Sequence, residues 1–146
     1  MRIIFIGCVD FSYHCLKELF LRKEEVVAVF SKKASVFNAD FKDLQPLARR
    51  YRVPYYAVAN VNDAKWVRKI KKYRPDVIFC FGWSDLIGKE LLNIAPYGII
   101  GTHPTALPLN RGRHPLVWSL FLGLKRSGLT FFRMNEKPDG GLISRG

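Results

Sequence analysis

The segment Pro75–Gly82, with the sequence PDVIFCFG, limits the possible folds of this chain more than any other stretch. It is apolar almost without a break, which is typical of a strand in a sheet that is covered on both faces. Other short, β-rich apolar runs alternate along the chain with segments of helical spacing. This alternation predicts an α/β fold with a Rossmann-like, doubly wound and mostly parallel sheet, and 146 residues suffice for one such domain.

The expected helices and strands follow from the spacing of the apolar residues. Strands are predicted over residues 2–7, 25–31, 54–61, 75–82, 97–103 and 128–134. Helices are predicted over residues 10–23, 40–53, 62–73, 84–94 and 114–123. We expect Ser84 to cap the helix that follows it and Pro46 to interrupt or kink the helix that contains it.

Charge and cysteine content narrow the class of protein. The formal net charge is +12, and residues 1–74 hold 16 lysines and arginines against 7 acidic residues. The cluster Arg68–Arg74 could attract a polyanion, but apolar residues at helical spacing around it favour a solvated helix face. Three scattered cysteines indicate buried thiols in a reducing compartment, with no metal site in view. Because no apolar run is long enough to span a membrane, we expect a cytoplasmic protein.

Four partly polar segments follow predicted strands, namely Gly7–Phe11, Phe81–Ser84, Gly101–Pro104 and Asn135–Gly141. The carboxyl ends of parallel strands meet at one edge of a sheet, so we expect these segments to share one site there. The glycine pattern GxGxxG and the P-loop pattern are both absent. Ordinary dinucleotide binding and P-loop chemistry are therefore disfavoured.

Two residues stand out as acid or base groups. His103 ends a predicted strand beside Pro104, and Asp139 lies in a polar loop 36 residues later, next to two glycines. A structural histidine and a turn aspartate are the alternatives. His114 precedes a proline, which favours a helix cap over a catalytic role.

Other residues are suited to ligand contact. Arg111 and Arg113 flank a glycine and could bind phosphate or carboxylate, or simply face water. Trp83 could line a pocket for a flat heterocycle or belong to the core. We expect Gly7 to form a tight turn between strand and helix and Asp10 to be the N-cap of that helix. Contact with the substrate is the alternative role for both residues.

Four segments together resemble the formyltransferase family that uses 10-formyltetrahydrofolate: MRIIFIGCVDFSYHCLKEL, PDVIFCFGWSDLI, GTHPTALPLNRGRHPLVW and GLTFFRMNEKPDGGLI. The similarity runs from Met1 to about Ile143. Its most specific part is the HPxxLPxxRG block that begins at His103, together with the PDGG-type loop that begins at Pro138. The stretch LPLNRGRHPLVW, together with FCFGW, is most similar to the nucleotide-sugar N-formyltransferases.

The resemblance implies a fold like that of glycinamide ribonucleotide formyltransferase and assigns roles to named residues. A histidine and an aspartate acting on the formyl carbonyl fall on His103 and Asp139. The cofactor-binding residues are expected to be Phe81, Gly82, Trp83, Leu86, Ile87 and Asp139. The substrate-binding residues are expected to be Gly7, Asp10, Thr105, Arg111 and Arg113.

Two departures from the family pattern are visible. The family has an asparagine two residues before the histidine, where this chain has Gly101. Asn110 or Thr102 could take its place, and Asn110 is the candidate catalytic residue. Family domains also continue past the aspartate loop, so we expect residues 1–146 to be a catalytic domain without the last strand and helix segment.

The expected function is transfer of a formyl group from 10-formyltetrahydrofolate to the amine of a nucleotide-linked amino sugar. One alternative is an enzyme similar to methionyl-tRNA formyltransferase, kept open by the basic first half of the chain. The other is a catalytically impaired domain that binds folate or nucleotide. We expect a small-molecule substrate, no membrane partner and a possible homo-oligomer.

Overall fold

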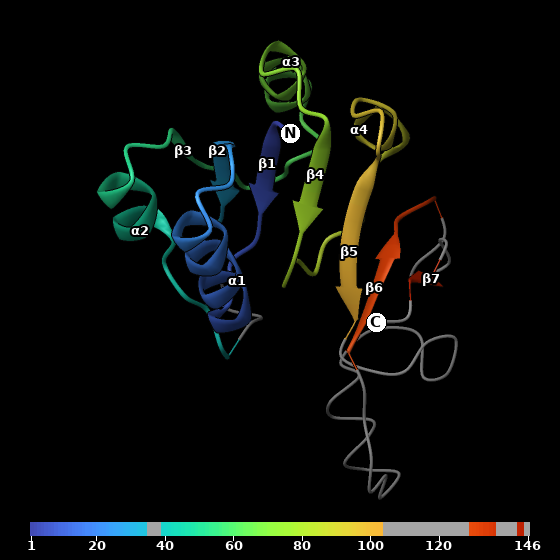
Figure 1. Cartoon of the computed structure of the whole chain (residues 1–146). Helices are drawn as coiled ribbons and strands as arrows, with labels where there is room; N and C mark the ends of the chain where they lie inside the picture. The colour runs from blue at the N-terminus through green and yellow to red at the C-terminus, as the bar shows by residue number, and fades with distance from the viewer. Residues whose placement is uncertain (35–38, 104–128, 137–142, 145–146) are drawn as a thin grey trace, which may run out of the picture.

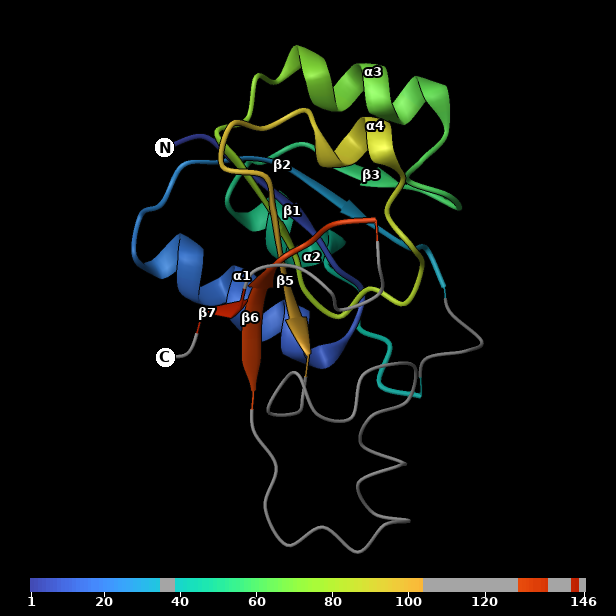
Figure 2. The same cartoon turned by 90° about the vertical axis from the view of Figure 1, so that its right-hand side faces the viewer.

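The computed structural model describes residues 1–34, 39–103, 129–136 and 143–144, which form a sheet with helices on both faces (Figures 1 and 2). The strands are β1 (Ile3–Ile6), β2 (Val26–Ser31), β3 (Tyr55–Ala57), β4 (Val77–Cys80), β5 (Ile99–His103), β6 (Thr130–Arg133) and β7 (Ile143–Ser144). The helices are α1 (Asp10–Leu21), α2 (Gln45–Arg50), α3 (Ala64–Lys72) and α4 (Lys89–Leu92).

The sheet runs in the order β3-β2-β1-β4-β5-β6-β7. The pairs among the first five strands are all parallel, whereas β6 is antiparallel to β5 and β7 is antiparallel to β6. The prediction of a doubly wound, mostly parallel sheet is therefore confirmed. The strand order reverses between β1 and β4, so the carboxyl ends of these strands are the expected place for a ligand.

Alternation along β1 explains the two layers of the core. Ile4 and Ile6 face α3 and α4, whereas Phe5 faces α1 and α2, and all three side chains are fully buried. Figure 2 shows α3 and α4 on one side of the sheet and α1 on the other. Burial of each large apolar side chain contributes about 1.5–3 kcal/mol, and this burial on both faces holds the edge of the sheet in place.

Two helices begin later than the sequence predicts. Pro46 does not kink a long helix, because α2 starts at Gln45 and the proline stands in its first turn, where a missing N–H costs nothing. Ser84 does not cap a helix, because α4 spans only Lys89–Leu92 and its N-cap is Gly88. Residues 81–88 therefore form a loop rather than a helix start.

The direction of β6 corrects the prediction that four segments share one edge of the sheet. Thr130 lies opposite His103, and Arg133 lies opposite Ile100. Since β6 runs back along β5, Asn135 and Glu136 lie beyond the amino end of β5, at the edge opposite to His103. The rest of the predicted segment, with Asp139, lies outside the described residues.

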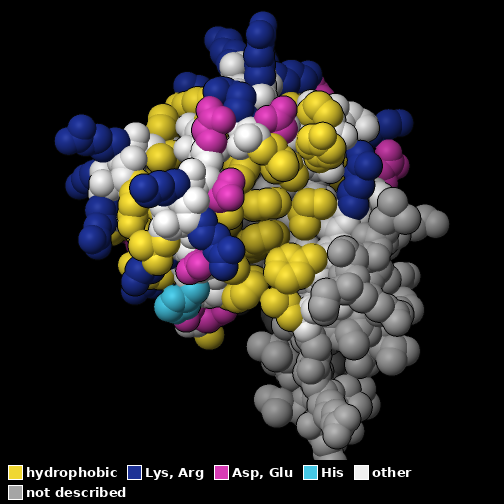
Figure 3. Space-filling view, viewed as in Figure 1, with side chains coloured by type: hydrophobic (Ala, Val, Ile, Leu, Met, Phe, Trp, Pro, Cys, Tyr) yellow, Lys and Arg dark blue, Asp and Glu magenta, His cyan; other side chains and the backbone are white. Residues whose placement is uncertain are grey.

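One face of the sheet carries apolar side chains that the described residues cover only in part. Phe79 and Ile100 are half-buried on the side of α1, and Phe131 is 38% exposed. Figure 3 shows hydrophobic side chains gathered beside α1 on this face. The predicted helix at 114–123 falls outside the described residues, and in the part that is described no helix has the length and apolar character needed to cross a membrane.

Candidate active site

His103 is the last residue of β5 and therefore stands at the carboxyl edge of the sheet. Its side chain is only 4% exposed, and it shares a face of the strand with Ile99 and Gly101, the face covered by α4. Cys80 at the end of β4 pairs with Gly101. The loop that starts at Phe81 thus leaves the sheet beside the last residues of β5.

The turns after β1 and β4 pack directly against each other. A side chain at Gly7 would come within 2.4 Å of the Phe81 carbonyl oxygen, and one at Gly82 would come within 2.2 Å of Val9. Ser12, fully buried in α1, donates a hydrogen bond of 2.5 Å to the Phe81 carbonyl. These contacts join the turns after β1 and β4 closely at the point where the strand order reverses.

Asp10 is the first residue of α1 rather than its N-cap, which corrects the prediction. Val9 is the N-cap, and its N–H donates to Ser12 Oγ at 3.2 Å. The Asp10 carboxylate lies 3.3 Å from His14 Nε2, with both side chains more than half exposed. Its negative charge at the start of the helix is favourable for the helix dipole and remains accessible from solvent.

The residues predicted to hold the folate ring do not line a single wall. Phe81 is buried on the α1 face, where its ring contacts four others, those of Phe5, Phe11, Phe79 and Phe131. Ile87 is buried on the opposite face, with half-buried Trp83 packed against the same cluster. Leu86 is 67% exposed. Trp83, Leu86 and the backbone of Gly82 are therefore the accessible parts of the predicted wall.

Sequence reasoning missed two side chains that hold this loop. Asn62, before α3, donates from Nδ2 to the Leu86 carbonyl at 2.8 Å, and its Oδ1 accepts from the Gly88 N–H at 2.7 Å. Lys32, directly after β2, forms an ion pair of 2.8 Å with Asp85. Neither residue has a distinctive sequence pattern, because the loop that each contacts is more than 20 residues away in the sequence.

Gly101 is surrounded by apolar side chains of β6 and its continuation. A side chain placed there would meet Phe132 Cζ and Met134 Cγ, both at 3.1 Å. Phe132 is buried, and its ring has little freedom to move. An asparagine at this position would therefore require its neighbours to shift by a few tenths of an ångström.

The three thiols are free, as the sequence predicts. Cys8 and Cys80 are buried and Cys15 is half-buried. Burial raises the pKa of both Cys80 and Cys15, so their thiols stay protonated at neutral pH. Cys8 donates to the Gly82 carbonyl at 3.4 Å, which adds another contact between the turns after β1 and β4.

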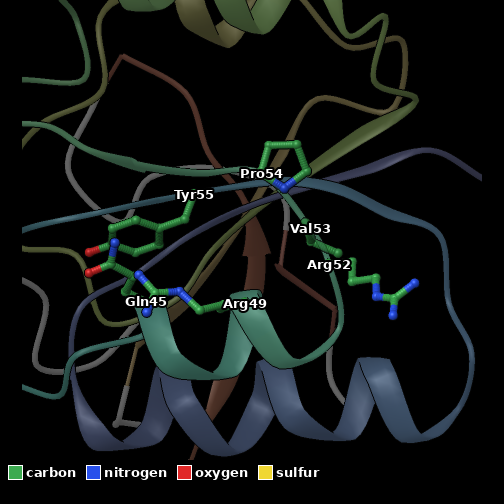
Figure 4. A pocket seen from close by; sticks show the side chains of 6 residues that line it. All are labelled: Gln45, Arg49, Arg52, Val53, Pro54 and Tyr55. Carbon is green, nitrogen blue, oxygen red and sulfur yellow. The ribbon is translucent and has the colours of Figure 1, made fainter.

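A hollow of about 370 Å³ lies between α2 and β3, away from His103 (Figure 4). In Figure 4 the side chains of Gln45, Arg49 and Tyr55 point toward one another, whereas Arg52 points away from them. Burial raises the pKa of Tyr55, so its hydroxyl stays neutral. The described residues that line this open, basic hollow include none of the predicted catalytic residues.

Several predicted site residues fall outside the described residues: Thr105, Asn110, Arg111, Arg113 and Asp139. Their roles stay predictions. Those that are described, Gly7, Asp10, Phe81, Gly82, Trp83, Leu86, Ile87 and His103, lie at or next to the carboxyl edge of β1, β4 and β5.

The family model for formyl transferase matches residues 1–144 of this chain. The chain belongs to the formyl transferase family. Membership over nearly the whole chain confirms the predicted resemblance and the assignment as a formyltransferase, with 10-formyltetrahydrofolate as the formyl donor of the family.

Solved structures of similar fold come from several bacteria. A phosphoribosylglycinamide formyltransferase from Bacillus halodurans is 18% identical, with a TM-score of 0.81 over 98% of this chain and 76% of that one. Glycinamide ribonucleotide transformylase 1 from Symbiobacterium toebii is 21% identical, with a TM-score of 0.80 over 99% and 71%. A formyltetrahydrofolate deformylase from Pseudomonas syringae is 22% identical, with a TM-score of 0.79 over 97% and 48%. Because the sequence identities are low, the similarity to these structures establishes the fold of this formyltransferase and not its substrate.

Proposed function

We propose that this formyltransferase transfers the formyl group of 10-formyltetrahydrofolate to the amine of a nucleotide-linked amino sugar, in a cytoplasmic setting. The observation that carries the proposal is the placement of buried His103 beside the loop that begins at Phe81, at the carboxyl ends of adjacent strands. Family membership supports the donor. The resemblance of the stretches LPLNRGRHPLVW and FCFGW to nucleotide-sugar N-formyltransferases supports the acceptor class.

The reaction needs one proton to move while one bond forms and another breaks. The acceptor amine attacks the formyl carbon, the bond from that carbon to the folate nitrogen breaks, and a proton passes from the amine to the departing nitrogen. In the proposal His103 carries this proton, because an imidazole can accept and donate near neutral pH. Asp139 orients the imidazole and stabilises its protonated form. Asn110 is the proposed donor to the developing oxyanion.

A panel of acceptors tests the proposed substrate class. Purified protein with 10-formyltetrahydrofolate is given nucleotide amino sugars, glycinamide ribonucleotide, methionyl-tRNA or water alone, and the formylated product is measured by mass spectrometry. Formylation of a nucleotide amino sugar with the highest kcat/KM supports the proposal. Preferential turnover of glycinamide ribonucleotide or of the tRNA, or hydrolysis of the donor alone, refutes the acceptor class.

We expect binding of a reduced folate to change the fluorescence of Trp83, because this half-buried ring lies in the loop proposed to hold the pterin. The measurement is a titration with 5-formyltetrahydrofolate in a variant whose other two tryptophans, Trp66 and Trp118, are phenylalanine. Calorimetry provides an independent readout. Saturating ligand with neither a fluorescence change nor heat would rule out the folate site.

Replacing Arg111 or Arg113 by alanine is expected to raise the KM for the acceptor by about tenfold or more, with the KM for folate little changed. The reason is that a guanidinium bound to a phosphate is lost along with its charge-assisted hydrogen bonds. Steady-state kinetics with each substrate varied in turn gives the two values. Arg126→Ala, farther along the sequence, is a control for a general loss of positive charge.

A second candidate function, folate binding without turnover, is favoured by the packing at Gly101. There, Phe132 and Met134 occupy the space beside the position at which the family has an oxyanion-binding asparagine. Gly101→Asn alone overpacks this place, whereas Gly101→Asn with Met134→Ala removes one of the two side chains that crowd it. We expect the double variant to bind folate normally and to raise kcat by up to about 100-fold if a missing donor limits the rate, as judged by initial rates. No gain in a folded double variant would mean that another group already fills this role.

A further inference from the structure

The side chain of Lys32 packs against the loop that follows β4 and contacts two residues of that loop, Trp83 and Asp85. It comes directly after Ser31, the last residue of β2, and its side chain is only 15% exposed. Its Nζ atom is 2.8 Å from Asp85 Oδ2 and 5.0 Å from the centre of the Trp83 ring. One ammonium group thus joins an acidic and an aromatic side chain that are separated by one residue in the sequence.

Because the Lys32 ammonium is largely buried, its contacts with Asp85 and Trp83 are needed to stabilise its charge. A charged group that is largely removed from water is stable only where a counter-charge and a polarisable surface replace its hydration. Asp85 supplies the counter-charge, and the face of the Trp83 ring supplies the negative part of its quadrupole. Since both partners belong to one short loop, the same contacts limit where that loop can lie.

Trp83 depends on Lys32 because its own polar atom does not anchor it. The indole Nε1 is buried and, within the described part of the chain, donates to no acceptor. Its orientation therefore comes from packing against the apolar cluster under α3 and α4 and from the cation above its ring. At the other end of the loop, Asn62 holds the backbone of Leu86 and Gly88.

We propose that Lys32 is a positioning residue for the donor site: by pairing with Asp85 and lying over Trp83, it holds the loop 82–88 in the conformation that accepts the reduced folate. This inference rests on the proposed function, since it takes the loop as the folate-binding element. Lys32 touches neither substrate in this role. It acts on donor binding through the ring and the loop, so the expected effect falls on KM for the donor and not on kcat.

The test compares three variants of adjacent lysines. Lys32→Met keeps the length of the side chain and removes the charge, Lys32→Arg keeps the charge, and Lys33→Met removes the charge of the next residue, which is exposed. The probe is 5-formyltetrahydrofolate, titrated by the fluorescence of Trp83 in the background without the other tryptophans and by calorimetry in the natural sequence. Steady-state kinetics on the natural background follow KM and kcat separately.

We expect Lys32→Met to raise the Kd of the folate and the KM for the donor about tenfold, with kcat within about twofold of the natural protein. Lys32→Arg should restore binding to within about threefold, and Lys33→Met should bind as the natural protein does. Acrylamide should also quench Trp83 more strongly in Lys32→Met, because the ring is no longer held by the cation.

The possible failures are distinguishable. If the natural protein binds no folate, the proposed function is wrong and this inference falls with it. If the natural protein binds folate and Lys32→Met binds it equally well, or loses kcat at unchanged KM, only the positioning role of Lys32 is overturned. Should Lys32→Met not fold, Asp85→Asn breaks the same ion pair from its more exposed side, and unchanged folate affinity in that variant overturns the inference.

Discussion

Replacing His103 by asparagine is expected to lower kcat by about two to four orders of magnitude, with the affinity for folate little changed. Asparagine preserves some of the polarity at this buried position but does not accept and return a proton near neutral pH. The loss corresponds to a positioned acid or base group that acts in the transition state and not in ground-state binding. Initial rates with both substrates saturating, together with a folate titration, separate the two effects.

Because His103 is only 4% exposed, the variant needs a check of its fold. Urea denaturation of His103→Asn measures its stability, and His14→Asn is the matched control. His14 lies on the exposed surface of α1, 3.3 Å from Asp10, and is expected to leave kcat unchanged. Activity that survives in a well-folded His103→Asn variant would mean that the end of β5 is not the catalytic centre.

Gly82→Ala is expected to lower the free energy of unfolding by about 2–5 kcal/mol, the largest effect on stability that we predict. Gly82 has a φ of 66°, which lies in the left-handed region that is unfavourable for alanine. The added methyl group would also lie 2.2 Å from Val9 Cγ2 and 2.5 Å from Ser12 Oγ. Since whole domains are stable by only about 5–15 kcal/mol, the variant should unfold at a much lower urea concentration.

Gly88→Ala is the control for this change, because it alters the other glycine of the same loop. Gly88 has a φ of −73°, and the nearest atom to an added methyl group is Asn62 Oδ1 at 3.1 Å, on a side chain that can shift. A loss of less than about 1.5 kcal/mol is expected there. Equal urea midpoints for the two variants would show that the turns after β1 and β4 are not tightly packed against each other.

The strands were predictable because a strand that is covered on both faces of the sheet appears in the sequence as a short, continuous apolar run. The segment 75–82 contains β4, and the segment 97–103 contains β5, with each strand shorter than its run. The direction of β6 was not predictable in this way. Its apolar pattern is the same for a parallel and an antiparallel strand, and only pairing with β5 decides which edge Asn135 lies on.

The two helix errors have separate physical reasons. Pro46 fits the first turn of α2 because the N–H that proline lacks has no partner there in any helix. Serine is a preferred N-cap residue, but the loop backbone after Ser84 is held by Asn62. This side chain hydrogen-bonds Leu86 and Gly88, which are 24 and 26 residues away in the sequence. Tertiary hydrogen bonds of this kind override local capping preference.

The candidate site was predictable to the extent that it follows strand ends. The position of His103 and Gly82 at one edge of the sheet was predictable because parallel strands end there together. Lys32 was missed because a single lysine after a strand has no distinctive pattern, and its partner Asp85 is distant in the sequence. The crowding of Gly101 by Met134 depends on the pairing of β5 with β6 and has no signal in the sequence.

His103 and Asp139 are proposed to act as one catalytic unit on the formyl group, and a double-mutant cycle on kcat tests this coupling most directly. His103→Asn, Asp139→Asn and the double variant are compared with the natural protein at saturating 10-formyltetrahydrofolate and the preferred acceptor. Residues that serve one transition state together do not add, so the double variant should be no more than about threefold slower than the slower single variant. Losses that multiply in the double variant, or a single variant with undiminished kcat, would contradict the claim.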